Sequence, residues 1–254
     1  MKQLIRSHAT NSVVGPPLRR INTSLVHIAG VTRTWLKFGR HHDAPLDPFE
    51  LIEVDPNRIT CLFDEEDYFE QPIYTTELAG GQWDRYVTDL EAYDLYRSFV
   101  AHFEDGVPWS ETDLYARVET EAERDDWAKW GCTDMSDFRA HIEEYDRLYE
   151  RIRRDGYKTQ RQLHGTSNRE RLGRSPPLAM PPELFEITVV IGPTGRLMFH
   201  YQGRHRLAIA KILDLETIPV RVRARHEEWQ QTRDAVARGV STEHDTSHPD
   251  LRQL

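Results

Sequence analysis

The sequence predicts an α+β protein with a small mixed sheet, flanking helices and a helical insert. Residues 185–224 follow the pattern strand, hairpin turn, strand, helix, strand. Residues 49–63, FELIEVDPNRITCLF, add two extended pieces around a Pro turn. Between these regions, residues 88–155 repeat apolar side chains every three or four positions, a period typical of helices. The sheet is therefore expected to form from two separated parts of the chain.

The C-terminal third has the clearest pattern. Its expected elements are strand FEITVVI (185–191), turn GPTG (192–195), strand RLMFHY (196–201), the apolar helix LAIAKIL behind Gly203, and strand IPVRVRA (218–224). Residues 226–238 predict a polar helix. The segment after Gly239 has little apolar content, so we expect it to be disordered.

The central region predicts helices built on amphipathic faces. One is expected from Thr88 to Phe103, closed by Gly106, and another from Ser136 to Asp155, closed by Gly156. The acidic residues 110–130 between them are also expected to be helical. The chain then divides into a basic arm (1–48), an α+β domain (49–225) with a helical insert at about 88–165, and a C-terminal helix with a disordered tail (226–254). Residues 1–30 have turn signals and little periodicity, so this part of the arm is expected to be loosely held.

Composition excludes several classes of protein. No run of eighteen apolar residues is present, so no transmembrane helix is expected, and the N-terminus lacks the apolar core of a secretory signal. The two cysteines, Cys61 and Cys132, stand far apart, which favours a reduced cytoplasmic location over a disulfide framework. Neither the cysteines nor the histidine pairs have zinc-site spacing, so no metal held by such a cluster is expected.

Positive charge is concentrated at the N-terminus. Residues 1–42 contain seven Lys or Arg and no Asp or Glu, and because the whole chain is −9 the remainder carries −16. Such an arm indicates either DNA or another anionic surface as a partner, or docking of the arm on its own acidic body. Val31, Trp35 and Phe38 also share one face of a short helix, which packs on the body or contacts a membrane or partner.

The stretch YQGRHRLAIAKILDLETIPVRV (201–222) places Gly203, Arg204, His205 and Arg206 at the start of an apolar helix. Free N–H groups and the positive end of the helix dipole attract anions there. Basic side chains at the positive end of a helix dipole are electrostatically unfavourable unless an anion binds there. Arg also offers paired hydrogen-bond donors suited to phosphate. The stretch therefore predicts a phosphate-binding site.

This stretch resembles the signature of the ParB/sulfiredoxin superfamily, in which a glycine–basic quartet precedes an Ala-rich helix and an "IPV" strand. LIEVDPNRI (51–59) is similar to the early strand and turn of ParB-type domains. The resemblance implies a ParB/sulfiredoxin-like fold that binds ATP or CTP, usually with Mg²⁺, through the quartet. It covers residues 185–224 and 50–60, and not the helical middle.

Departures from the family pattern narrow the implied activities. Sulfiredoxin chemistry needs a cysteine where Arg204 stands, and the kinase-like members tend to carry an acidic residue where Gln202 stands. The segregation clamps continue into a helix-turn-helix and a dimerisation domain, whereas about thirty residues follow IPVRV here. The acidic body also disfavours a DNA clamp.

Phosphoryl transfer requires a base or a Mg²⁺ ligand near the phosphates. Asp84 in the glycine loop GGQWD and Asp55 in VDPNRI are the candidates, although both positions also suit turn or cap residues. His205 is the candidate for proton transfer. Lys158, one of five lysines, either contacts a phosphate or simply follows a helix end.

These observations predict a nucleotide-binding protein that transfers a phosphoryl group to a small hydroxyl-bearing acceptor. An alternative is a DNA-binding or nuclease-type ParB-like protein that uses the arm 1–42. A third is a non-catalytic protein that recognises an anionic partner at the glycine–basic quartet.

Overall fold

The computed structural model describes residues 16–65, 68–124, 132–163, 180–242, 246–252 and 254. The strands are β1 (Leu51–Val54), β2 (Cys61–Phe63), β3 (Glu77–Ala79), β4 (Val87–Asp89), β5 (Ile187–Ile191), β6 (Leu197–Phe199) and β7 (Ile218–His226). The α-helices are α1 (Pro16–Thr34), α2 (Asp94–Phe103), α3 (Asp113–Ala122), α4 (Met135–Asp155), α5 (Arg204–Ile212) and α6 (Glu227–Ala237). A π-helical turn, η1 (Trp35–Gly39), continues α1.

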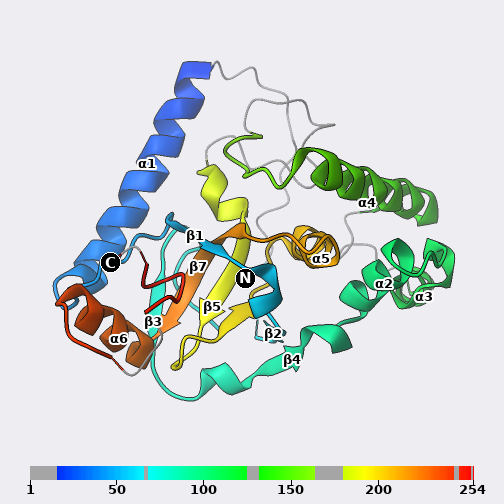
Figure 1. The fold of residues 1–254 in the computed structure, drawn as a ribbon. Coiled ribbons are helices and arrows are strands. Elements are labelled where there is room, and N and C mark those ends of the chain that lie inside the picture. Colours follow the sequence, from blue (N-terminus) through cyan, green and yellow to red (C-terminus); the bar gives the residue numbers. More distant parts are fainter. Residues whose placement is uncertain (1–15, 66–67, 125–131, 164–179, 243–245, 253) are drawn as a thin grey trace.

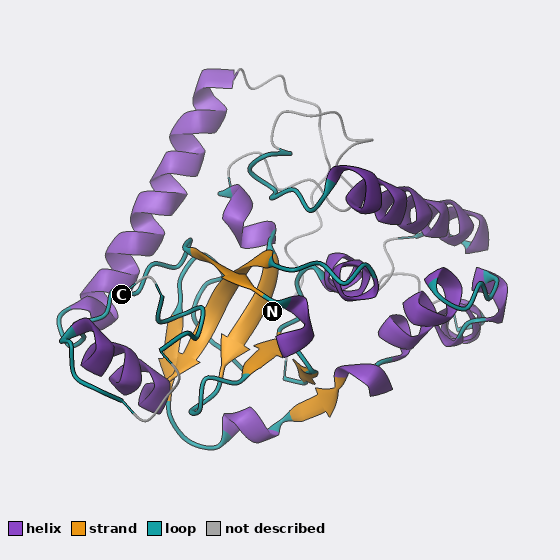
Figure 2. Ribbon diagram, in the orientation of Figure 1, coloured by secondary structure: helices purple, strands orange, loops and turns teal. Residues whose placement is uncertain are grey.

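The strands form one mixed sheet with the order β1-β7-β5-β6-β2-β4, and β3 pairs with the second half of β7. Strands β5 and β6 make the expected antiparallel hairpin, and α5 connects β6 to β7, which lies parallel to β5. The α+β prediction with a mixed sheet is therefore confirmed. Helices α2, α3 and α4 lie beyond α5, on its far side from the sheet (Figures 1 and 2).

Helix α5 joins two apolar clusters. Its residues Leu207 and Ala210 pack with the sheet, in a cluster that includes Val189 and Val220. Its residues Ala208 and Ile209 pack instead with the side chains of α2, α3 and α4. Because α5 buries apolar residues on two sides, its start is held in place by both halves of the molecule.

A β-bulge in the pairing of β5 with β7 changes the direction of one arginine. Val189 lies opposite Val222, but Val190 lies opposite Ala224. The extra residue shifts the two-residue alternation of side chains, so Arg225 projects to the face opposite that of Arg221. On that face Arg225 meets the C-terminal segment.

Two predictions about the chain ends are wrong. The segment after Gly239 is not disordered over residues 246–252, because His248, Asp250 and Leu251 are buried there. Residues 1–30 do not form a loose arm over their described part, since α1 is a regular helix from Pro16. Residues 1–15 and 243–245 lie outside the described residues.

The helical middle differs from the prediction at its start. Residues 87–89 are strand β4, paired with β2, so the helix begins at Asp94 and not at Thr88. The second helix is α4, which ends at Gly156 with a positive φ of 74°. Residues 125–130 of the expected acidic helix (110–130) lie outside the described residues. Within the described part of the chain, no helix has the length and apolar content needed to cross a membrane.

Candidate functional site

The start of α5 is an unusual backbone arrangement. Gln202 N donates to His200 O at 2.6 Å, which closes a tight turn around Tyr201 with its φ of 51°. Gly203, the N-cap residue, has a φ of 87° and offers no side-chain cap. A Cβ on Gly203 would lie 2.8 Å from Ile187 Cα, so glycine is required both by conformation and by space. The first N–H groups of α5 therefore have no capping side chain, and no acidic residue lies in the first turn.

Arg206 is buried, and its guanidinium is hydrogen-bonded to other groups of the protein. Its Nη1 donates to Glu186 Oε2 and to Tyr157 Oη, both at 2.9 Å, and its Nη2 donates to Phe185 O. The Glu186 side chain is fully buried. Burial raises the pKa of Glu186 although Arg206 acts to lower it. This ion pair holds the start of α5 against β5.

His205 packs among aromatic rings of the helical cluster. Its ring centroid lies 5.7 Å from that of Phe99 and 4.3 Å from that of Tyr145. Burial, with the neighbouring charges of Arg204, His141 and Arg206, lowers the pKa of His205 to about 3. At neutral pH the imidazole is uncharged, so it adds no cation to a phosphate site.

Arg204 is the member of the quartet whose charge is least engaged. Its side chain is partly exposed, and Nη1 donates to Tyr93 Oη at 3.3 Å. The adjoining cavity, lined by Tyr93, Leu95 and Phe199 among others, has a volume of about 10 Å³. That volume holds about one water molecule, so a phosphate group does not fit inside this cavity.

Asp84 does not lie near the start of α5. It lies against the hairpin between β5 and β6, where a Cβ on Gly192 would be 3.6 Å from Asp84 Cβ. Gly203 contacts Ile187, at the other end of the five-residue strand β5, and a strand of that length spans roughly 16 Å. The loop carrying Asp84 is a turn held by Trp83, whose buried indole donates to Ala79 O at 2.9 Å.

Asp55 also lies away from the quartet. Its Oδ1 accepts from Asn57 N at 2.8 Å and so caps a short helical turn. Lys211, in the last turn of α5, donates to Pro56 O at 3.2 Å, which places Asp55 near the C-terminal end of that helix. The expectation that Asp84 or Asp55 joins the quartet is therefore not met by the geometry.

Lys158 lies on the segment that reaches the quartet. It follows Tyr157, which contacts Arg206, and its half-exposed ammonium lies 3.9 Å from Asp155 Oδ2. The residues that the sequence reasoning missed are Tyr93, Tyr157 and Glu186. Glu186 had one signal, because it is an acidic residue within the apolar strand sequence FEITVVI, where a buried carboxylate requires a partner.

These residues do not make a protein-ligated Mg²⁺ site. Among the described residues, no group of three or more His, Cys, Asp or Glu side chains is placed to hold a metal ion. Glu186, a carboxylate that contacts the quartet, already accepts hydrogen bonds from Arg206, Tyr157 and the Gln160 N–H.

Comparison of the chain with protein-family models, curated proteins and solved structures finds no match.

Proposed function

We propose that the chain binds the phosphates of a nucleoside triphosphate, ATP or CTP, at the start of α5. The observation that carries this proposal is the uncapped first turn, in which Gly203 supplies no side chain and three basic residues follow it. The resemblance to the ParB/sulfiredoxin superfamily supports the same ligand at the same residues. An anion there satisfies the free N–H groups and offsets the unfavourable charge at the positive end of the helix dipole.

Within this proposal, the members of the quartet have different roles. The proposed donors are the backbone N–H groups of the first turn and the side chain of Arg204. Arg206 positions that turn through Glu186 and does not carry a free charge. His205 fixes α5 against α2 and α4. Lys158, the residue after Tyr157, is proposed as a further cation at the edge of the site.

Transfer of the phosphoryl group to a small hydroxyl-bearing acceptor remains the second step of this proposal. The positions of Asp84 and Asp55 remove the base candidates that the sequence suggested. Nucleotide binding is therefore the part that the geometry supports best. Mg²⁺ would have to reach the site with the nucleotide, as it commonly does when phosphates supply most of its ligands.

Titration calorimetry with ATP and CTP, each with Mg²⁺, tests the proposal. The informative variant is Arg204→Gln, because it leaves the Arg206–Glu186 pair intact. Arg153→Gln, on the exposed side of α4, is the matched control. We expect one nucleotide to bind, Arg204→Gln to weaken it about tenfold or more through loss of a charged hydrogen bond, and the control to be unchanged. The absence of binding by either nucleotide would overturn the proposal.

A further inference from the structure

The N-terminal helix presents large apolar side chains to the outside of the molecule. Leu25, Ile28, Trp35 and Leu36 are 57%, 59%, 51% and 58% exposed, and we call this set the outer stripe. Their spacing places them on one side of α1 and η1. The helix lies at the edge of the molecule, with α6 near its lower end (Figure 1).

The opposite side of the same helix is the one attached to the body. His27 stacks on Phe49 with ring centroids 4.4 Å apart, and Thr34 is buried. A Cβ on Gly30 would collide with Tyr74 O, which shows how closely the helix approaches the 71–74 segment. The body therefore already occupies the inner side, and the outer stripe is additional to it.

Basic groups border the outer stripe. Arg33, Lys37 and Arg40 follow the stripe along the helix, and the Arg40 guanidinium lies 5.2 Å from the centre of the Trp35 ring. No acidic residue occurs before Asp43. Glu77 faces this border, because its Oε1 lies 3.8 Å from Lys37 Nζ and offsets part of that charge.

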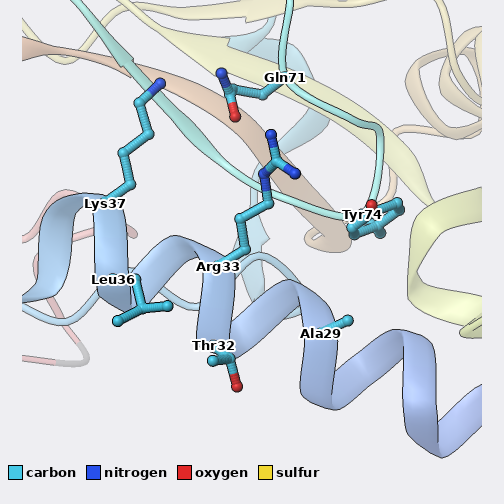
Figure 3. A pocket seen from close by; sticks show the side chains of 7 residues that line it. All are labelled: Ala29, Thr32, Arg33, Leu36, Lys37, Gln71 and Tyr74. Atoms are coloured by element: carbon cyan, nitrogen blue, oxygen red, sulfur yellow. The ribbon is translucent and has the colours of Figure 1, made fainter.

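A cleft opens beside this border. Its volume is about 640 Å³, and its lining includes Arg33, Leu36, Lys37, Gln71 and Tyr74. Arg33 and Lys37 extend from the helix toward the segment that carries Gln71 and Tyr74 (Figure 3). Leu36 belongs both to the cleft lining and to the outer stripe, so the cationic cleft and the apolar stripe are continuous.

We propose that α1 and η1 form a docking surface for a bilayer that contains anionic phospholipids. The outer stripe would enter the boundary between headgroups and acyl chains, and Arg33, Lys37 and Arg40 would contact lipid phosphates, with the cleft receiving a headgroup. A helix with apolar residues on one side, Arg and Lys beside them and an exposed Trp has the composition of interfacial helices. This site is separate from the start of α5 and does not depend on the proposed function.

Charge and apolar area together favour an anionic bilayer over a second copy of the chain or a nucleic acid. A second copy docked stripe against stripe would bring the two basic borders together, and like charges at contact oppose association. Nucleic acid would neutralise the arginines but would leave four large apolar side chains in water or against phosphate. An anionic bilayer satisfies both the charge and the apolar area.

Co-sedimentation of the full chain with vesicles tests the proposal. We expect sedimentation with mixed phosphatidylcholine and phosphatidylglycerol vesicles, weakening as salt is added, and little with phosphatidylcholine alone. Leu25→Ser combined with Ile28→Ser and Leu36→Ser should abolish it. Arg33→Gln combined with Arg40→Gln should weaken it about twenty-fivefold, since each basic residue near an anionic surface contributes about fivefold.

Matched controls come from exposed residues elsewhere. Tyr86→Ser with Val240→Ser removes exposed apolar groups, and Arg147→Gln with Arg153→Gln removes two exposed arginines of α4. Both controls should sediment like the parent chain. Vesicles whose acyl chains carry bromine should quench the tryptophan fluorescence of the parent chain. They should quench the fluorescence of Trp35→Phe less.

Three results would overturn the proposal. The first is the absence of sedimentation with anionic vesicles at low salt. The second is binding of duplex DNA, but not of vesicles, by the parent chain, with that DNA binding lost when Arg33→Gln is combined with Arg40→Gln. This result would assign the surface to nucleic acid. The third is a dimer lost in the Leu25, Ile28 and Leu36 serine variant, again without vesicle binding, which assigns it to a second copy of the chain.

Discussion

Arg225 and Asp250 form an ion pair in which both side chains are 1% exposed and Nη2 lies 2.6 Å from Oδ1. The second carboxylate oxygen accepts from Arg225 Nε at 2.9 Å and from the Trp229 indole at 2.8 Å. Although burial acts to raise the pKa of Asp250, Arg225, Arg233 and Trp229 hold it below its usual range. The pair attaches the C-terminal segment to the end of β7.

Asp250→Ala is expected to lower the free energy of unfolding by about 3–5 kcal/mol, because it leaves Arg225 buried without its counter-ion. Urea denaturation followed by circular dichroism measures this loss. Asp43→Ala breaks the Arg238–Asp43 pair, whose side chains are both 55% exposed, and should cost less than about 1 kcal/mol. Equal small losses in the two variants would show that the C-terminal segment contributes little.

Gly203→Ala should destabilise the protein more than Gly81→Ala. Both glycines have positive φ, 87° and 91°, so alanine is strained at either position by about 1–2 kcal/mol. At Gly81 nothing lies within 4 Å of an added Cβ, whereas at Gly203 the Cβ would meet the backbone of Ile187 at 2.8 Å. The difference between the two unfolding free energies measures the close contact alone. Equal losses would mean that Ile187 moves aside freely.

Arg206→Met is expected to cost about 3–5 kcal/mol of unfolding free energy, because Glu186 would remain buried without its partner. Adding Glu186→Gln should restore a large part of the loss, since the amide carries no charge. A thermodynamic cycle of the two single variants and the double variant measures this coupling. If the two losses add without coupling, the ion pair does not hold the start of α5.

His205 should make stability depend on pH. Because the folded pKa is about 3 and the unfolded pKa is about 6.5, the unfolded chain binds a proton in this range and the folded chain does not. The stabilisation is complete above about pH 6.5 and is lost as the pH falls toward 3. The loss of unfolding free energy between neutral and acidic pH should therefore be smaller in His205→Phe than in the parent chain. A His205 imidazole that titrates near its usual pKa in an NMR experiment would contradict this.

Strands β1, β5, β6 and β7 were the predictable part of the fold because their signals are local, whereas β3 and β4 were not predicted. Alternating or continuous apolar residues and turn residues marked β1, β5, β6 and β7 within a few positions of their bounds. The C-terminal segment was mispredicted because its order depends on Arg225, which lies 25 residues before Asp250 in the chain. The polar composition of this segment predicts disorder, but it does not show that the fold places a buried arginine beside Asp250.

The candidate site was predictable only at its backbone. Gly203 between a strand and a helix indicates a sharp turn, and the turn is present. The surroundings of the basic side chains depended on tertiary contacts, because Glu186 and Tyr157 bind Arg206 and aromatic rings of α2 and α4 pack against His205. The grouping of Asp84 and Asp55 with the quartet failed because sequence motifs do not show which end of a strand or helix a loop meets.

The two-sided burial of α5 has a consequence for how the molecule opens. Separation of α2, α3 and α4 from the sheet would expose Ala208 and Ile209, while unfolding of the sheet would expose Leu207 and Ala210. Neither half can therefore be lost without uncovering α5. The two halves should behave as a single cooperative unit, and amide hydrogens of α5 should exchange only through global unfolding.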